Sequence, residues 1–458
     1  MIQIKNKDAL IKNGETELVR KARTLALRSL ECALKAVDPK QLLKTKLLLK
    51  NSRLHVDDFS FDLTKFRSVY VVGGGKAGGA MVEALEEILD KHITGGIVNV
   101  PYGAKHKSRV IEVHEANHPL PDKAGMKGTM RMMQIAESAE KDDLLICLIS
   151  GGGSSLMPFP REGVSLEDKS AVTNALLKSG AAISEVNTVR KHLSAFKGGW
   201  LAKKAYPATV LNLILSDVMG DPLESIASGP TVPDSSTFAD AKKVLEKHSL
   251  WKTAPSSVRK ILSDGVEGHI AETPKPGDPA FERVSNVIVG NNQTASQAAV
   301  ECLKRDGLST LLLTDTLEGE ASCAGEALGR FACEIASSGK PLPKPVGVVA
   351  GGETTVAVKG KGSGGRNQEL ALSAALQISG AEVCAVASFS TDGVDGPTDA
   401  AGAIVDGNTL ARAALHGLKP EEFLTNNDSY SFFSKLKDLI LTGQTGTNVN
   451  DISVIVIL

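Results

Sequence analysis

Four glycine-rich segments of this sequence carry lysine, arginine, paired aspartates or serine hydroxyls, which are groups that bind phosphate or take part in phosphoryl transfer. The first segment, VYVVGGGKAGGAM, places Lys76 among glycines between an apolar run and an expected helix. Glycines let backbone N–H groups approach an anion, and a helix N-terminus adds positive potential. We therefore expect Gly74, Gly75 and Gly78 to contact phosphate and Lys76 to neutralise its charge. A tight strand-to-helix turn with a solvated Lys76 is the alternative.

The second segment, SGGGSSL, follows an apolar run and places hydroxyl groups beside accessible amides. This combination indicates a polyphosphate-binding loop made of Gly152, Gly153, Ser154 and Ser155. The esterase pattern G-x-S-x-G does not fit, because its final glycine is missing here. A plain turn is the alternative interpretation.

Two further segments of the first half carry charges that could serve a phosphate ligand. In NTVRKHLSAFKGG, helical spacing places Arg190, Ser194 and Lys197 on one face, where two cations could bind an anion. A solvated basic face is equally open. In LSDVMGD, Asp217 and Asp221 follow an expected strand and could hold Mg²⁺. Asp221 precedes a proline, so a turn-shaping role is open as well.

The remaining two glycine-rich segments lie in the second half of the chain. Glu353 ends a strand in GGETTV, and Arg366 and Asn367 open a helix in GGRNQE. A guanidinium at a helix N-terminus is unfavourable unless an anion lies there, so we expect Arg366 to face a phosphoryl oxygen or a carboxylate. In STDGVDG, Asp392 and Asp395 follow a strand and fit a general base with a metal or hydroxyl ligand.

These segments together favour phosphoryl transfer. That reaction needs positioned amides, cations, Mg²⁺ and a carboxylate that orients the attacking hydroxyl. The sequence offers no Ser–His or Cys–His set for nucleophilic catalysis and no HExxH zinc spacing. Gly73-x-Gly75-x-x-Gly78 formally matches the dinucleotide fingerprint, but Lys76 occupies the loop and no acid ends the next strand.

The elements that must position these residues alternate between short apolar strands and helical stretches. Expected strands lie at 68–72, 96–100, 110–113, 144–149 and 209–215 and then at 284–289, 310–314, 346–349, 383–388 and 452–457. The first fifty residues have helical spacing, and a polar, proline-bearing linker covers 263–279. The pattern predicts two three-layer α/β domains at 1–270 and 280–458, the first with a mainly parallel sheet. The run His114–His118 indicates a strand-end loop, and the polar loop 442–451 could close over a ligand.

Composition excludes several classes of partner. The 458 residues carry 52 basic and 53 acidic side chains, a formal net charge of −1 that gives no electrostatic basis for binding nucleic acid or an anionic membrane. Six separated cysteines without a CxxC pair predict reduced thiols. No apolar run reaches membrane-spanning length and the N-terminus has no signal-peptide core, so we expect a cytoplasmic enzyme. Homo-oligomer formation stays open.

Nine motifs together resemble the glycerate kinases of the MOFRL family, some of which have been named hydroxypyruvate reductases: VVGGGKAGGAM, SGGGSSL, NTVRKHLSAFKGG, LSDVMGD, SGPTVPD, GGETTV, GGRNQELAL, STDGVDGPTDAAG and TGTNVND. The resemblance runs from about residue 15 to the C-terminus, with Gln444 as a departure where many members have proline. It implies ATP- and Mg²⁺-dependent phosphorylation of D-glycerate, typically to 2-phosphoglycerate, with Lys76, Arg366 and Asp392 as active-site residues. It also implies a Rossmann-like N-terminal domain and a smaller MOFRL-like C-terminal domain with a cleft between them. An NAD(P)H-dependent hydroxypyruvate reductase is the alternative.

Overall fold

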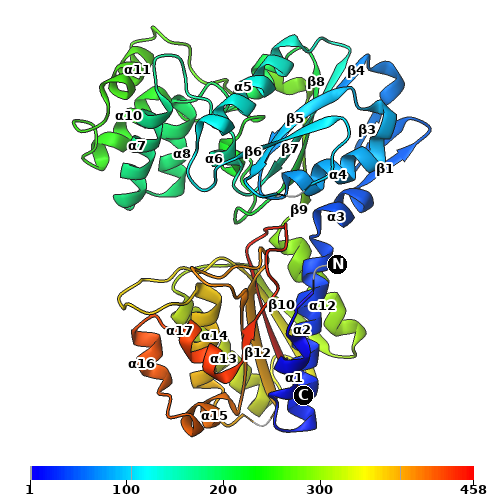
Figure 1. The fold of residues 1–458 in the computed structure, drawn as a ribbon, viewed down its shortest axis with the longest axis vertical. Coiled ribbons are helices and arrows are strands. Elements are labelled where there is room, and N and C mark those ends of the chain that lie inside the picture. The colour runs from blue at the N-terminus through cyan, green and yellow to red at the C-terminus, as the bar shows by residue number, and fades with distance from the viewer. Residues whose placement is uncertain (1–2, 105, 382) are drawn as a thin grey trace. The chain divides into compact units, whose positions relative to one another are not determined.

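The structure, a computed structural model, describes residues 3–104, 106–381 and 383–458. The chain divides into two compact units (Figure 1). Residues Pro39–Val289 form the inserted unit, and Met1–Asp38 join Gly290–Leu458 in the terminal unit. The prediction of two domains is confirmed, but the chain crosses between them twice, at residues 38–39 and 289–290.

A six-stranded sheet with the order β6-β5-β4-β7-β8-β9 forms the centre of the inserted unit. Its strands are β4 (Ser68–Gly74), β5 (Gly95–Pro101), β6 (Ile111–Ala116), β7 (Asp143–Ser150), β8 (Thr209–Leu215) and β9 (Val284–Gly290). The strands from β6 to β8 pair in parallel, and every residue of β7 is buried. The five strands predicted in the first half and their parallel arrangement are thus confirmed. β9, which the sequence placed at the start of the second domain, instead joins β8 in this sheet.

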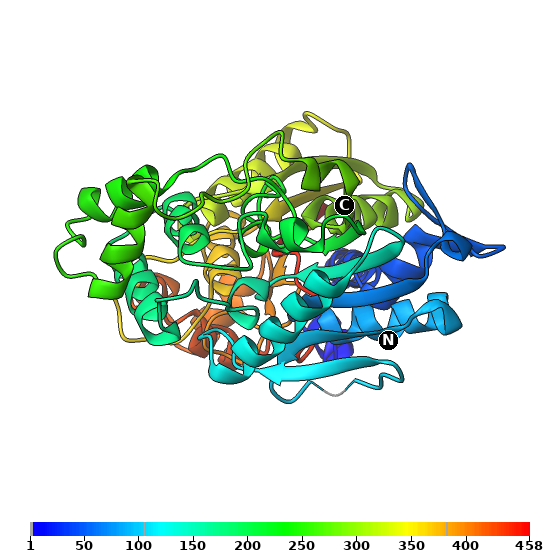
Figure 2. The same cartoon turned by 90° about the horizontal axis from the view of Figure 1, so that it is seen from above.

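Helices and a small second sheet complete the inserted unit. The helices are α3 (Pro39–Lys46), α4 (Gly78–Leu89), α5 (Lys123–Ser138), α6 (Gly153–Leu156), α7 (Leu166–Lys178), α8 (Ile183–His192), α9 (Trp200–Ala205), α10 (Phe238–Lys247) and α11 (Ser256–Val266). The small antiparallel sheet contains β1 (Leu47–Lys50), β2 (Arg53–Val56) and β3 (Phe59–Asp62). The group α7, α8, α10 and α11 lies at one end of this unit and β1–β3 at the other, with β4–β8 between them (Figures 1 and 2). These four helices bury their apolar faces in a core of their own, because apolar residues recur at helical spacing, as Val258 and Leu262 do on α11.

The terminal unit is built on a mixed sheet with the order β10-β11-β15-β12-β13-β14. Its strands are β10 (Ser309–Leu317), β11 (Val346–Gly352), β12 (Cys384–Ser390), β13 (Gly402–Asp406), β14 (Leu439–Ile440) and β15 (Asp451–Ile457). Only the β10–β11 pair is parallel among the pairings of these strands. Its helices are α1 (Lys7–Lys12), α2 (Glu17–Ala36), α12 (Asn292–Arg305), α13 (Ala321–Ser338), α14 (Arg366–Gln377), α15 (Thr409–Leu415), α16 (Pro420–Thr425) and α17 (Ser429–Leu436). α2 and α12 cover one face of the sheet, and α13 and α14 cover the other, which confirms the three-layer prediction (Figure 1).

The N-terminal helical segment belongs to the terminal unit, although the sequence placed it in the domain at 1–270. α2 packs on α12, β12 and β15. Its Leu27, Leu30 and Leu34 are fully buried there, and the buried Arg23 guanidinium donates to the carboxylates of Asp406 and Asp438. A charge that is buried in this way must be paired within its own core. Asp406 lies 383 positions and Asp438 lies 415 positions from Arg23, so this pairing leaves no local signal in the sequence.

Candidate active site

Lys76 lies in a corner where glycines permit close packing. The three amides at 75–77 donate to oxygens at the ends of β5 and β7, over 2.8–3.1 Å. A Cβ on Gly75 would lie 2.0 Å from Ser150 Oγ, and the φ of +152° also favours glycine. These amides are therefore engaged within the protein, while the side chain of Lys76 is half-buried. Phosphate binding at this corner stays a prediction for Gly74, Gly75 and Gly78.

The turn after β7 brings Lys76 together with a histidine. Gly152 has φ +80°, and a Cβ there would lie 2.8 Å from the His118 ring and 3.5 Å from Lys76 Cγ. Burial, followed by the positive charge of Lys76, lowers the pKa of His118. A neutral imidazole at this place can accept or donate a hydrogen bond without adding charge. From the sequence we expect His118 only to lie in a strand-end loop, because its proximity to Lys76 depends on the folded sheet.

The serines of the second glycine segment form hydrogen bonds within the inserted unit. Ser154 Oγ lies 3.1 Å from Ser228 Oγ, which donates in turn to Asn187 Oδ1 (3.1 Å). Ser155 Oγ donates to Gly152 O (3.0 Å). Gly153 begins the short helix α6, and a Cβ on it would lie 2.9 Å from the backbone oxygen of residue 74. The turn is thus anchored on β4, and its role in phosphate binding stays a prediction.

Arg190 and Lys197 lie close in the fold but do not share a helix face. α8 ends at His192, and Ser194 Oγ then accepts from the amides of residues 196 and 197 (3.2 Å each). The predicted continuous helix is wrong because this serine bonds to the following amides instead of continuing the helix. The solvated basic face is also wrong for Lys197, which is 1 % exposed. Its Nζ donates to Ser154 O (2.9 Å) and thereby reaches the second glycine segment.

Asp217 and Asp221 follow β8 and are both half-buried. Asp221 has φ +54°, a left-handed conformation that aspartate tolerates better than most residues. Within the described ranges, no group of three or more His, Cys, Asp and Glu residues could hold a metal ion. Mg²⁺ is commonly bound by one or two carboxylates together with substrate phosphates. The donor set of Asp217 and Asp221 fits that mode, and their metal role stays a prediction.

In the terminal unit, strand register gathers the predicted charges at one edge of the sheet. Asp451, the first residue of β15, lies opposite Gly352 of β11 and opposite Ser390 of β12. Glu353 directly follows Gly352, and Asp392 lies two residues beyond Ser390. Because β15 runs antiparallel to both neighbours, its first residue meets their last ones. This register brings three acidic side chains from distant segments to the same edge.

Arg366 opens α14 beside this edge and donates to two of these carboxylates. Its Nε and Nη2 donate to Asp451 (2.6 and 3.0 Å), and its Nη1 donates to Glu353 (2.6 Å). Burial would lower the pKa of Arg366, but the charges of Asp451 and Glu353 raise it overall. Burial raises the pKa of Asp451 to about 7, against the lowering effect of Arg366. The expected anion beside Arg366 is therefore a carboxylate of the chain itself.

Asp395 and Asn367 hold the start of α14. The Asp395 carboxylate accepts from the amides of Asn367 (3.1 Å) and Gln368 (2.9 Å), which are two of the free N–H groups of the first turn. Burial raises the pKa of Asp395, while these amides lower it. Asn367 Oδ1 accepts from Ser388 Oγ (2.7 Å) on β12. Both residues are buried and fix the position of Arg366, and their contact with a ligand stays a prediction.

Asp392 lies in a loop that is tied to the segment 442–450. Its Oδ1 accepts from Ser390 Oγ and from Val394 N (3.0 Å each). A Cβ on Gly393, where φ is +87°, would lie 2.0 Å from the backbone oxygen of residue 443. The segment 442–450 is also held by Thr391, whose Oγ1 accepts from Val449 N (2.9 Å). The half-buried Asp392 carboxylate is thus oriented by two donors, as a base that must meet a hydroxyl requires.

Asp451 is the main residue of this site that the sequence did not single out as a candidate. It closes the motif TGTNVND, and the only available signal was its position directly before the last strand. In the structure it is buried and holds two donors of Arg366. The terminal unit therefore presents an oriented carboxylate and a fixed guanidinium at one sheet edge. This arrangement can activate a hydroxyl and stabilise the negative charge that develops on a transferred group.

Two family models match the chain. Residues 25–263 match a domain of unknown function (DUF4147), and residues 346–451 match the MOFRL family. The second match contains the segments that carry Arg366, Asp392 and Asp451.

Similar proteins cover nearly the whole chain. A glycerate 2-kinase of Pyrococcus horikoshii is 44% identical over 436 residues, which are 95% of this chain and 97% of that protein. A D-glycerate 2-kinase of Thermotoga maritima is also 44% identical over 436 residues, 94% of this chain and 97% of that protein. The crystal structure of a glycerate kinase from Thermotoga maritima matches with a TM-score of 0.85 at 42% identity, covering 95% of this chain and 99% of that one. With its MOFRL domain and these relatives, the chain belongs to the glycerate kinases of the MOFRL family.

Proposed function

We propose that the chain transfers the terminal phosphoryl group of ATP to D-glycerate and releases 2-phosphoglycerate and ADP. The observation that carries this proposal is the strand register around Asp451, because it gathers Arg366 and Asp392 at one sheet edge in a member of the glycerate kinases. Phosphoryl transfer requires little covalent chemistry from the protein. It requires positioned charges and one carboxylate at the attacking hydroxyl.

Asp392 orients the glycerate hydroxyl and takes its proton as the oxygen attacks phosphorus. The two hydrogen bonds to its Oδ1 orient the carboxylate for this contact. Arg366 stabilises the transferred group. A guanidinium has five N–H donors, and three of them donate to Asp451 and Glu353. The two others can meet a phosphoryl oxygen without any movement of the side chain, which is the preorganisation that electrostatic catalysis needs.

In the inserted unit, Lys76 neutralises charge on the phosphoryl group, and Arg190 and Lys197 bind anionic parts of the substrates. Asp217 and Asp221 would hold Mg²⁺ together with nucleotide phosphates, since that donor set fits the ion. The ion would draw charge from the phosphate oxygens. The glycine segments at 73–79 and 151–155 lie beside Lys76 and supply the corner in which phosphate is bound.

A reductase function has less support. Asn99, at the position where a dinucleotide site would have an acid near the end of β5, is buried and donates to Gly125 O (3.0 Å) and Leu156 O (2.7 Å). We further propose that the enzyme works in the cytoplasm, where its six unpaired cysteines would stay reduced.

The decisive assay compares two reactions of the purified chain. ADP release is measured with ATP, Mg²⁺ and D-glycerate, and loss of NADH absorbance is measured with hydroxypyruvate. We expect glycerate-dependent ADP release and no NADH oxidation. NADH oxidation without ADP release would overturn the proposal. In the described part of the chain, no helix is long and apolar enough to span a membrane.

A further inference from the structure

Lys169 is a buried lysine whose side-chain amine makes no hydrogen bond in the described part of the chain. It lies on α7, is 6 % exposed, and its Nζ has no partner in the described part of the chain. A buried amine without a partner is costly, and such groups are rare in folded proteins. The contacts of Lys169 therefore give no structural reason for its buried amine, which points to a ligand.

Two further cations lie within electrostatic range of Lys169. Burial, followed by the charge of Arg190 on α8, lowers the pKa of Lys169 to about 7. Burial, followed by Lys169 and Arg190, also lowers the pKa of Lys197 well below its usual range. Over residues 3–104, 106–381 and 383–458, no ion pair joins any of these three cations to a carboxylate. Three basic side chains are thus held together without a carboxylate partner in the described part of the chain. We call Lys169, Arg190 and Lys197 the cation triad.

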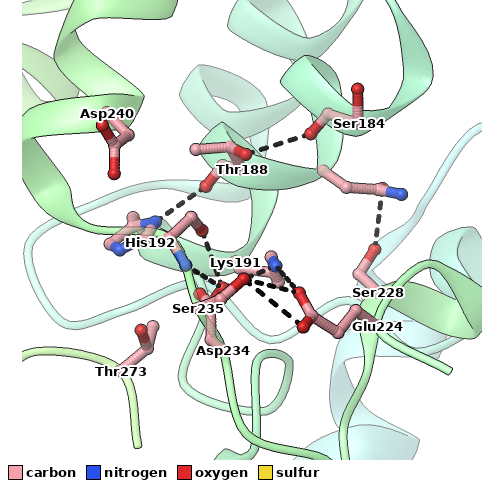
Figure 3. Close-up of polar contacts among 12 residues, drawn as sticks. Ser184, Thr188, Lys191, His192, Glu224, Ser228, Asp234, Ser235, Asp240 and Thr273 are labelled. Carbon is pink, nitrogen blue, oxygen red and sulfur yellow. Dashed lines mark hydrogen bonds and ion pairs between the residues drawn. The ribbon is translucent and has the colours of Figure 1, made fainter. Parts of the chain in front are cut away.

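Lys191, which follows Arg190 on α8, shows how a buried lysine with a structural role is paired in this part of the fold. Lys191 is as buried as Lys169, but its Nζ lies 2.6 Å from Asp234 Oδ1 and 3.5 Å from Glu224 Oε2 (Figure 3). The inserted unit therefore provides carboxylates where a buried lysine serves the fold alone. Arg190 of the cation triad, one residue earlier on the same helix, receives none in the described part of the chain.

The amine of Lys197 contacts backbone oxygens. Lys197 Nζ donates to the backbone oxygens of Ser154 (2.9 Å) and Ala227 (3.4 Å). Ala227 and Ser228 have φ values of +50° and +61°, a left-handed conformation that is unfavourable for both residue types. Hydrogen bonds hold this turn against Lys197 and against the hydroxyl of Ser154. Arg190 is less buried than the two lysines and marks the side from which a ligand can enter.

We propose that the cation triad is a binding site for a phosphate-bearing anion and that Lys169 is its central ligand-binding residue. A single carboxylate would neutralise only one of three cations. A phosphate monoester carries about 1.5–2 negative charges at neutral pH, and a polyphosphate carries more. The guanidinium of Arg190 matches phosphate oxygens with two parallel donors. The anion can be the phosphate chain of the nucleotide or the phosphate of the phosphorylated product. The choice of these two sources rests on the proposed phosphoryl transfer. The binding of a phosphate-bearing anion by the cation triad does not depend on it.

The test uses calorimetric titration of the full-length chain without turnover. The titrants are tripolyphosphate, ADP and 2-phosphoglycerate, applied to the wild type, to Lys169→Met and to Lys178→Met. Lys178 is an exposed lysine on the same helix, so the control removes the same charge without touching the triad. We expect Lys169→Met to weaken tripolyphosphate binding at least tenfold, while Lys178→Met changes it less than twofold. A tenfold loss for ADP assigns the phosphate to the nucleotide, and a tenfold loss for 2-phosphoglycerate assigns it to the product.

Thermal unfolding separates ligand binding from a structural role. Replacing an unpaired buried amine by methionine removes a desolvation cost, so the Tm of ligand-free Lys169→Met should rise. The stabilisation of the protein by tripolyphosphate should shrink in the same variant. Unchanged binding of all three anions, or a lower Tm of the ligand-free variant, would overturn the proposal. A chain that binds tripolyphosphate through Lys169 but does not phosphorylate glycerate would overturn the proposed function and leave this inference standing.

Discussion

Arg366 of the terminal unit donates to two carboxylates, whereas the cation triad of the inserted unit has no carboxylate partner among the described residues. The two arrangements suit different tasks. A guanidinium fixed by Asp451 and Glu353 keeps one geometry and offers its two remaining donors in a constant direction. Unpaired cations, in contrast, gain most of their stabilisation only when an anion arrives. Under the two proposals, Arg366 is a fixed charge for catalysis and the cation triad is a set of charges for binding.

The largest effect is expected from Asp392→Asn, which tests whether the sheet edge with the fixed guanidinium carries the chemistry. The amide keeps the hydrogen-bonding shape but cannot take a proton, so kcat should fall about 10²–10⁴-fold with little change in KM for ATP. Steady-state kinetics measure this split. Asp399→Asn is the matched control, because Asp399 is exposed and accepts only from Tyr430 (2.8 Å). An Asp392→Asn enzyme with normal turnover would remove this residue from the reaction.

A somewhat smaller effect is expected from Arg366→Ala. Loss of the guanidinium removes transition-state stabilisation and should lower kcat about 10²–10³-fold. Arg366→Lys should recover little of it, because a single amine cannot donate to Asp451 with two groups and to Glu353 as well. Arg330→Ala serves as control, since Arg330 forms only an exposed pair with Glu326 on α13. Equal rescue by lysine would show that the fork geometry is irrelevant.

A paired cation should stabilise the fold where an unpaired one does not. Arg23→Ala leaves two buried carboxylates without their partner and should lower the free energy of unfolding by about 3–5 kcal/mol, the reverse of the sign expected for Lys169→Met. Arg28→Ala on the same helix breaks a pair between an exposed guanidinium and the half-buried Asp306 at the end of α12, and should cost less, about 1 kcal/mol. Urea unfolding followed by circular dichroism measures both. Equal losses of unfolding free energy in the two variants would contradict the distinction between a buried paired arginine and an exposed one.

The pH dependence sharpens the role of Asp451, whose pKa burial raises to about 7. As the pH falls through 7, Asp451 gains a proton and its hold on Arg366 weakens, so kcat should drop about tenfold per pH unit on the acid side. Asp451→Asn should be slower than the wild type and should lose this acid limb. An acid limb that survives in the variant would assign the titration to another group.

The same shift has a defined sign for stability. Between pH 4 and 7 the folded chain holds a proton on Asp451 that the unfolded chain has released. The contribution of this group therefore falls as the pH rises through that window, and Asp451→Asn should flatten the slope of the unfolding free energy. This is the smallest of the expected effects.

Much of the architecture could be predicted from the sequence, because buried parallel strands such as β7 are uninterrupted apolar runs followed by glycines. The position of α2 could not, since its partners Asp406 and Asp438 lie far along the chain. At the candidate site, motif position was enough to propose Lys76, Arg366 and Asp392. The pairing of Arg366 with Asp451 and Glu353 was not predictable from the motifs.

Lys169 shows the limit most clearly. In the sequence it is an ordinary lysine within the amphipathic segment LEDKSAVTNALLK, where a solvated position is the natural expectation. Its burial follows from the packing of α7 against α8, and its missing counter-ion can be recognised only when all neighbours are known. Asp451 is similar, because its register against β11 and β12 decides which side chain it meets.

The central claim is the phosphorylation of D-glycerate at its 2-hydroxyl, and phosphorus NMR of the reaction mixture tests it most directly. The purified chain is incubated with ATP, Mg²⁺ and D-glycerate, and the spectrum is recorded beside authentic 2- and 3-phosphoglycerate. The account predicts a growing 2-phosphoglycerate resonance that matches the ADP formed and is lost in Asp392→Asn. A 3-phosphoglycerate resonance would contradict the position of transfer, and ADP without any phosphoglycerate would contradict glycerate as the acceptor.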